Sequence, residues 1–314
     1  MPGMSHPFRW QIWRAVWFLM SSIAQGVSSL LPLLILGWPA TEVPDDVRGW
    51  NLTNDVKEDV LSLDLEENDF LYRIRRDSRI VYVSILDGDI VPPEYRTDGF
   101  LVLAKLQKIP KWNDKWKTLT VRNTAQGIES SPDEFPPHGL DLGQLNHPSA
   151  IFVNILDLTT VSRISYRLSR VRHGEESWVL KIARFKHEIS SLHNEVSVYS
   201  KLMASGFSFC PNFIGFVYEE TKDRTIGFLM EEISGRTPGI QDLKDCAETV
   251  RLLHEHGIVH GDINRYNFLV TDEGVKLFDF EVSAAQEDAD SGAAKEELKG
   301  LAARLEDELG IGRY

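Results

Sequence analysis

The sequence predicts a mixed α+β fold in which strand-rich stretches accompany a few amphipathic helices. The strands are indicated by short apolar runs bounded by turn residues, such as 79–85 and 225–230, since such runs fit a sheet that is buried on one side or both. The helices are indicated by apolar side chains that recur every three or four residues. This spacing extends over residues 187–202, 240–256 and 295–309.

The composition is that of a globular protein. At 314 residues the chain can hold one large or two small domains, and 42% hydrophobic with 26% charged residues is typical of a folded protein. The net charge is −13, and a strongly acidic chain binds nucleic acid poorly, so no nucleic-acid partner is expected. Cys210 and Cys246 are the two cysteines, which we interpret as free buried thiols because two cysteines make no disulfide framework or zinc site.

The first 40 residues (1–40) form a separate hydrophobic segment. No charged side chain occurs in residues 15–40, and about 20 apolar residues are enough to cross a bilayer as a helix. Residues 15–38 are therefore a candidate membrane anchor, with a secretory signal or a loosely structured tail as alternatives. The protein is accordingly expected to be membrane-associated or otherwise cytoplasmic.

Residues 41–130 are expected to form a small β-rich accessory region. Its expected strands are residues 79–85, 100–106 and 117–121. Residues 56–63 are interpreted as a short helix, because their apolar positions allow one face and Thr53 or Asn54 could cap it. Residues 131–147 contain prolines and glycines among acids, which is typical of a linker. No chemical motif stands out in this region.

The strongest chemical pattern lies in residues 254–283. It contains His260-Gly261-Asp262, then Asn267, then Asp279 at the end of a short apolar run. A carboxylate at Asp262 can orient an attacking hydroxyl and accept its proton, whereas an amide and a second carboxylate, at Asn267 and Asp279, can hold Mg²⁺ against nucleotide phosphates. Two short strands joined by a turn, at 268–270 and 275–278, are predicted to present these groups.

This pattern resembles the catalytic core of the protein-kinase-like superfamily. It is most similar to the atypical branch with His-Gly-Asp in the catalytic loop, which includes aminoglycoside and choline phosphotransferases and the small kinase of the tRNA threonylcarbamoylation machinery. The resemblance covers about residues 150–290 and places a kinase-like domain at residues 148–314. It implies a two-lobed fold with a short helical C-lobe, with ATP and Mg²⁺ as cofactors.

The resemblance also implies an ion pair that holds the phosphates. Residues 178–182 match the family's third strand, which places Lys181 at the position that pairs with the α- and β-phosphates. A lysine flanked by apolar residues needs an acid if it is buried. Glu195 in the following helix is the expected partner and Glu188 is the runner-up. The alternative for Lys181 is an exposed lysine at a strand edge.

The remaining site residues follow from the order of the family's elements. Met230 is expected at the back of the adenine pocket, with backbone groups of Glu231 and Ile233 binding the base. Ordinary kinases place a lysine two residues after the catalytic aspartate, where this chain has Asn264. The neighbouring Arg265 is a candidate substitute for that lysine, or faces solvent.

The chain departs from the family in the loop that covers the phosphates. Residues 150–156 and 164–168 are expected to be the first two strands of a five-stranded lobe, joined by a turn at 157–163. That turn has no glycine, so the hydroxyls of Thr159, Thr160 and Ser162 are its candidate phosphate donors. Glu281 also stands where the family has the glycine of Asp-Phe-Gly, which stiffens the backbone.

The function predicted from these residues is that of an ATP-dependent phosphotransferase acting on a hydroxyl of a small molecule or a protein. Asp262 is the expected base and Asn267 and Asp279 the expected metal ligands. The alternative is a catalytically weak pseudokinase that acts as a binding scaffold, which the glycine-free loop and the short C-terminal part favour. A third possibility, an extracytoplasmic binding protein, requires the first 40 residues to be an export signal.

Overall fold

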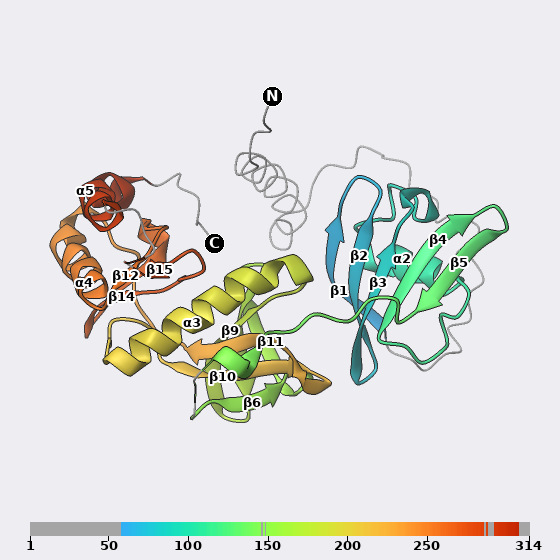
Figure 1. The fold of residues 1–314 in the computed structure, drawn as a ribbon, viewed down its shortest axis with the longest axis horizontal. Helices are drawn as coiled ribbons and strands as arrows, with labels where there is room; N and C mark the ends of the chain where they lie inside the picture. The colour runs from blue at the N-terminus through green and yellow to red at the C-terminus, as the bar shows by residue number, and fades with distance from the viewer. Residues whose placement is uncertain (1–57, 146, 148, 286, 288–291, 308–314) are drawn as a thin grey trace, which may run out of the picture. The chain divides into compact units, whose positions relative to one another are not determined.

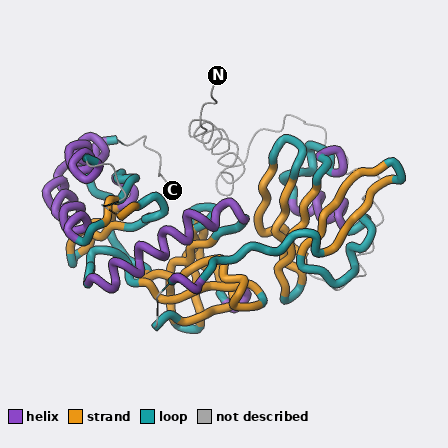
Figure 2. Tube along the Cα trace, viewed as in Figure 1, coloured by secondary structure: helices purple, strands orange, loops and turns teal. Residues whose placement is uncertain are grey.

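The computed structural model describes residues 58–145, 147, 149–285, 287 and 292–307, all within one compact unit of the chain. The described residues form a mixed α+β structure with two larger sheets, two small two-stranded sheets and four α-helices (Figure 1). Strands make up most of the described chain before the longest helix, Ile189–Ser205, and helices are more prominent after residue 231 (Figure 2). The expected α+β class is confirmed.

A five-stranded sheet forms the first part of the described chain. Its strands run in the order β1-β2-β3-β4-β5, all neighbours antiparallel except β3 and β4. The parallel pair requires a crossover, and helix α2 lies in that connection (Figure 1). The core between sheet and helix includes Tyr72, Val83, Val102 and Trp116. The elements are β1 (Glu58–Leu65), β2 (Phe70–Arg76), β3 (Arg79–Ile85), α2 (Gly99–Leu106), β4 (Thr118–Thr124) and β5 (Gly127–Pro132).

The short helix expected at residues 56–63 was wrong, because the described part of this segment is strand β1, paired with β2. The register shifts between Val60 and Ser62, which marks an extra residue in β1. This irregularity brings Val60 to the same core as Leu63 and Leu65. A strand with a bulge therefore produced the three-residue spacing that is typical of a helix.

The strand expected at residues 100–106 was also wrong, because Gly99–Leu106 is helix α2. The carboxylate of Asp98 accepts hydrogen bonds from the backbone N–H groups of Phe100 and Leu101, which satisfies donors at the start of the helix. Val102 and Leu106, one helical turn apart, are both fully buried. A continuous apolar run does not distinguish a buried strand from a helix, and here the aspartate cap was the decisive signal.

A six-stranded sheet forms the second part, with strand order β6-β10-β11-β9-β8-β7. It has one strand more than expected, because Thr159–Arg163, expected to lie in a turn, is strand β7. The expected strand at residues 150–156 is β6, which pairs in parallel with β10 at one edge. Helix α3 follows β9 and packs its buried residues Leu192, Val196 and Tyr199 into the core that includes Phe228. The elements are β6 (Ile151–Asn154), β7 (Thr159–Arg163), β8 (Leu168–His173), β9 (Glu176–Ile182), α3 (Ile189–Ser205), β10 (Phe213–Glu219) and β11 (Thr221–Glu231).

The turn between the first strands of this sheet was predicted at the wrong place. Thr159–Arg163 is strand β7, antiparallel to β8, and the chain reverses at residues 164–167. Thr159, Thr160 and Ser162 therefore belong to a strand, and the turn in the position of a phosphate-covering loop is Ile164-Ser165-Tyr166-Arg167. The β-branched and hydroxyl side chains of Thr159, Thr160 and Ser162 suit a strand at the sheet edge better than a turn without glycine.

The C-terminal part is mainly helical. Helix α4 ends before Gly257, whose φ of 74° is the left-handed conformation that terminates helices. The hairpin of β13 and β14, predicted at 268–270 and 275–278, is confirmed. In the described residues, no helix is long and apolar enough to cross a membrane; residues 15–38 lie outside them. The elements are α4 (Leu243–Glu255), β12 (Ile258–Val259), β13 (Phe268–Thr271), β14 (Gly274–Leu277), β15 (Ala284–Ala285) and α5 (Ala293–Glu306).

A buried ion network connects the two larger sheets. Glu219 at the end of β10 accepts hydrogen bonds from the Arg73 Nε (2.8 Å) and Tyr82 hydroxyl (2.7 Å) of the five-stranded sheet. It also pairs with Arg224 of β11 at 2.9 Å. Burial alone would raise the pKa of Glu219, but the two guanidinium groups hold it below its ordinary value. One carboxylate thus contacts two buried cations, and Arg224 also pairs with Glu220 at 2.9 Å.

Candidate active site

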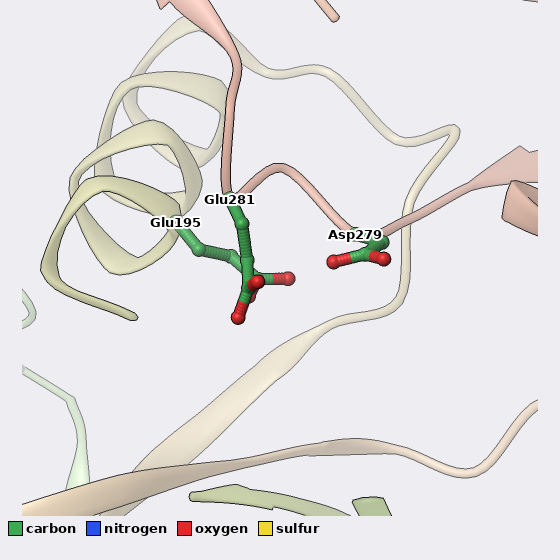
Figure 3. Close-up of side chains that lie close together, drawn as sticks. All are labelled: Glu195, Asp279 and Glu281. Carbon is green, nitrogen blue, oxygen red and sulfur yellow. The ribbon is translucent and has the colours of Figure 1, made fainter. Parts of the chain in front are cut away.

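Lys181 lies at the centre of the candidate site, surrounded by three carboxylates. Its Nζ is 2.6 Å from Glu195 Oε2, 2.6 Å from Asp279 Oδ1 and 3.2 Å from Glu281 Oε1. Figure 3 shows the side chain of Glu195 reaching out from α3 to meet that of Glu281, with Asp279 facing them from the same segment as Glu281. Lys181 is buried, so the alternative of an exposed strand-edge lysine was wrong.

The local sequence explains how this group forms. Lys181 projects from β9, in the middle of the sheet, where it is opposite Phe228 of β11 and Leu168 of β8. Glu195 lies on the buried side of α3 with Leu192 and Val196. The runner-up acid, Glu188, lies away from Lys181 and instead pairs with Arg184 at 2.6 Å. Helix α3 therefore brings Glu195 to the lysine.

The electrostatics show a surplus of negative charge. Burial raises the pKa of Glu195 to about 7; Asp279 and Glu281 add to this rise, while Lys181 opposes it. Burial would lower the pKa of Lys181, but the three carboxylates raise it above its ordinary value. Lys181 therefore stays protonated, and a further positive charge would stabilise the ionised carboxylates around it.

The backbone at Asp279 is in an unusual conformation. Its φ of 68° lies in the left-handed region, which a residue with a side chain adopts at some cost in free energy. The next residue, Phe280, is fully buried, and its N–H donates to Glu195 Oε1 at 3.3 Å. Asn194 of α3 donates to the Ser283 carbonyl at 2.8 Å. These contacts hold the strained conformation and aim Asp279 at Lys181.

His260 braces the loop that carries Asp262. Its Nε2–H donates to the Phe278 carbonyl at 3.0 Å, and its Nδ1 accepts from the Asp262 N–H at 3.3 Å. Burial lowers the pKa of this histidine, which keeps the ring neutral, as these two bonds require. The contacts agree with the interpretation of His260 as a structural residue. The Asp262 carboxylate itself is exposed, as a group that meets a substrate needs to be.

Asn267 is held with its amide oxygen available. Its Nδ2 donates to the Asp262 carbonyl at 2.8 Å, which fixes the orientation of the side chain. The residue is 1% exposed, and its Oδ1 has no hydrogen-bond partner among the described residues. A buried acceptor without a donor is costly in free energy. Mg²⁺ binds oxygen ligands of this kind, so Asn267 fits the expected role of metal ligand.

The other expected site residues lie at the edges of this arrangement. Met230 ends the buried part of β11, and Tyr199 donates to its sulfur at 3.6 Å. The Glu231 N–H is bonded to the Asn212 carbonyl, and Ile233, which follows β11, is half-buried. Arg265 lies in a short turn beside Tyr266, its guanidinium carbon 5.9 Å from that ring.

Two functional candidates on helix α5 had no motif in the sequence. Glu297 is buried and accepts from the backbone N–H groups of His260 (3.3 Å) and Gly261 (2.5 Å). About two helical turns further along α5, Arg304 donates to the Ile263 carbonyl at 2.6 Å. Together they hold the backbone on both sides of Asp262. Glu297 sits within an amphipathic pattern, so its sequence signal is a buried-face acid and nothing more specific.

Two further candidates, Arg167 and Glu281, contact each other beside Lys181. Arg167 is the last residue of the turn between β7 and β8, and its Nη1 is 2.7 Å from Glu281 Oε1. The sequence offered a signal for Glu281, since it replaces a glycine of the family motif. It offered none for Arg167, because the turn itself was misplaced.

Comparison with known proteins bears on this same region. Residues 235–294, a minor part of the chain, match the family model of the RIO domain. The match includes Asp262, Asn267 and Asp279. RIO kinases belong to the atypical protein-kinase-like superfamily, so the match indicates a kinase-like, ATP-binding phosphotransferase of that class and implies the use of ATP. No curated protein matches the sequence significantly.

Proposed function

We propose that the protein is an atypical kinase that transfers the γ-phosphate of ATP to a hydroxyl group of a small molecule or a protein. The observation that supports this most strongly is Lys181, buried on a central strand and held within 2.6 Å of both Glu195 and Asp279. A buried lysine paired with a helix acid and aimed at a metal-binding carboxylate is the arrangement that positions nucleotide phosphates in kinases.

Each residue then has one task. Asp262, exposed at the loop, orients the acceptor hydroxyl and takes its proton. Asn267 Oδ1 and the Asp279 carboxylate hold Mg²⁺, and Lys181, fixed by Glu195, binds the phosphates. ATP supplies the phosphoryl group, and Mg²⁺ neutralises its charge. Backbone groups of Glu231 and Ile233 bind adenine in front of Met230, and Arg265 contributes a positive charge near the γ-phosphate.

The proposed domain organisation follows the sheets. Residues 148–314 form the kinase-like domain, with residues 41–130 as an accessory region and residues 131–147 as a linker. Strand β5 ends at Pro132, so the first two residues assigned to the linker belong to this strand, and the chain next enters a regular strand at Ile151. A membrane tether at residues 15–38 remains a prediction from the sequence.

A second candidate function is that of a pseudokinase scaffold. It is favoured by Glu281, whose carboxylate lies 3.2 Å from Lys181, where it would compete with a nucleotide. It is also favoured by the turn at residues 164–167, which contains no glycine to bring backbone N–H groups close to phosphates. The two functions differ in whether bound ATP is turned over.

Calorimetric titration with ATP, with and without Mg²⁺, tests the proposal. We expect Mg²⁺-dependent binding that Asp279→Ala removes, whereas Asp272→Ala, an exposed aspartate in the hairpin turn, leaves binding unchanged. Binding would then justify a search for substrates by ADP release. Undetectable binding at millimolar ATP would overturn the kinase proposal and favour the scaffold.

A further inference from the structure

Arg167 occupies the position from which kinases cover the phosphates of the nucleotide. It ends the turn between β7 and β8, next to Leu168, which pairs with Lys181 across the strands. Two bonds fix it there: its Nε donates to the Ile182 carbonyl, and its carbonyl accepts from the Ile182 N–H, both at 2.9 Å. The guanidinium is thus anchored beside the strand that carries Lys181.

Arg167 and Lys181 meet at a single carboxylate oxygen. Glu281 Oε1 is 2.7 Å from Arg167 Nη1 and 3.2 Å from Lys181 Nζ, so the two cations flank one anionic atom. The Arg167 Nη2 group is buried and has no hydrogen-bond partner among the described residues. A buried guanidinium donor without an acceptor is costly, and the fork of Arg167 therefore has a donor left for a second oxygen.

Such a pair of cations is suited to a phosphate group. A guanidinium fork binds two oxygens of one phosphate, whereas an ammonium acts as a compact point charge. A carboxylate has the same sign of charge as a phosphate and also accepts charge-assisted hydrogen bonds through its oxygens. Glu281 extends from the segment that also carries Asp279 toward the other carboxylates (Figure 3).

We propose that Arg167 and Lys181 together bind the phosphates of the nucleotide, and that Glu281 holds this place until a phosphate displaces it. The inference rests on the proposed function and deepens it, since it assigns phosphate binding to a side chain where ordinary kinases use backbone N–H groups of glycines. It also assigns Glu281 an inhibitory role: because its carboxylate occupies the two cations, it lowers the apparent affinity for ATP.

The test is calorimetry of the full chain with Mg²⁺-ATP and, separately, with adenosine. Arg167→Met should weaken ATP binding about tenfold or more, the usual range for losing a charge-assisted hydrogen bond, and leave adenosine binding unchanged. Arg167→Lys should keep part of the affinity, because it keeps the charge and loses the fork. Glu281→Gln should strengthen ATP binding severalfold, again without effect on adenosine.

Arg172→Met is the matched control. Arg172 lies at the far end of the same hairpin and is exposed, so its substitution removes the same charge away from the site. Equal loss of ATP affinity in both variants would show a nonspecific charge effect and overturn the inference. A parallel loss of ATP and adenosine affinity in Arg167→Met would show a structural role for the turn and overturn it as well.

The outcomes separate this inference from the function on which it rests. If the unmodified chain binds Mg²⁺-ATP and Arg167→Met binds it equally well, the phosphate role of Arg167 is wrong and the kinase proposal stands. If Glu281→Gln weakens Mg²⁺-ATP binding, Glu281 is a metal ligand and its inhibitory part is overturned. If the unmodified chain binds no ATP, both the function and the inference fail.

Discussion

Two buried carboxylates, Glu219 and Glu195, stand in opposite electrostatic surroundings. Glu219 is shared by two arginines and a tyrosine hydroxyl, and its pKa is below the ordinary value. Glu195 shares one lysine with two other carboxylates, and burial with those acids raises its pKa to about 7. In the first cluster both arginines pair with carboxylates of the chain, Arg224 with Glu220 as well as Glu219, which is typical of a structural contact. The second is short of positive charge, which is typical of a site that binds a cation.

The parts of the chain that carry the two larger sheets also differ in the charged groups that they bury. In the five-stranded sheet the buried core is apolar, and its buried charged residue, Arg73, is directed to Glu219. Among the described residues, the part of the chain from β6 onward buries more ionisable groups: Lys181, Glu188, Glu195, Glu219, Arg224, Asp242, His260 and Glu297. Burying ionisable groups is costly unless they are paired, so their concentration in one part locates the chemistry there.

The largest expected effect is on turnover. Asp262→Asn should lower the rate of phosphate transfer by about 10²–10⁴-fold, the range of a general base, because the amide cannot accept the hydroxyl's proton. The affinity for Mg²⁺-ATP should stay the same. Rates of ADP release measure the first quantity and calorimetry the second. Asp272→Asn is the matched control, and normal turnover in Asp262→Asn would refute the assignment of the base.

The next largest effect is expected from removing Glu219, the carboxylate shared by Arg73 and Arg224. Glu219→Ala should lower the free energy of unfolding by about 3–5 kcal/mol, because it leaves Arg73 buried without an anion and removes one of the two carboxylates that pair with Arg224. Urea denaturation measures this change. Glu134→Ala, which removes an exposed partner of Arg122, should change stability little. Equal stability of Glu219→Ala and the unmodified chain would contradict the structural role of the network.

A smaller effect is expected from a single donor in that network. Tyr82→Phe removes the hydroxyl that donates to Glu219 at 2.7 Å and should cost about 1.5–3 kcal/mol, the range for a hydrogen bond to a charged group. Nucleotide affinity should not change, because Lys181 lies outside the network. A loss of ATP binding in this variant would show that the two clusters are coupled.

The most direct contrast between the two carboxylates is expected in the pH dependence of stability. The pKa of Glu219 is lowered in the folded state, so its contribution is present above its unfolded value and lost as the pH falls through the folded one. The pKa of Glu195 is raised from 4.5 to about 7, so its contribution is present below 4.5 and lost as the pH rises toward 7.

Thermal unfolding measured from pH 4 to 8 checks these slopes. Glu195→Gln should remove the decline between about pH 4.5 and 7, whereas Glu219→Gln should remove the decline on acidification. An unchanged slope in Glu195→Gln would mean that Lys181 keeps this carboxylate ionised, and the surplus of negative charge would then be smaller than we infer.

The sequence by itself determined the elements whose signals are local. Strand β3 and the hairpin of β13 and β14 carry their own turn residues, and α3 and α4 carry apolar faces of helical spacing, so each was predicted close to its observed bounds. The order of Lys181, Glu195, Asp262, Asn267 and Asp279 along the chain was also sufficient to predict a kinase-like site, since each residue follows an element with a recognisable pattern. The roles of these residues stay predictions until they are tested.

Only the tertiary structure decided what depends on pairing between distant segments. A bulge in β1 imitated helical spacing, and pairing with β8 made a strand of the expected phosphate turn. The contacts of Arg167 with Glu281, and of Glu297 with Gly261, join residues far apart in sequence. Such contacts have no local signal, because a side chain's partners are set by the packing of elements and not by its neighbours in the chain.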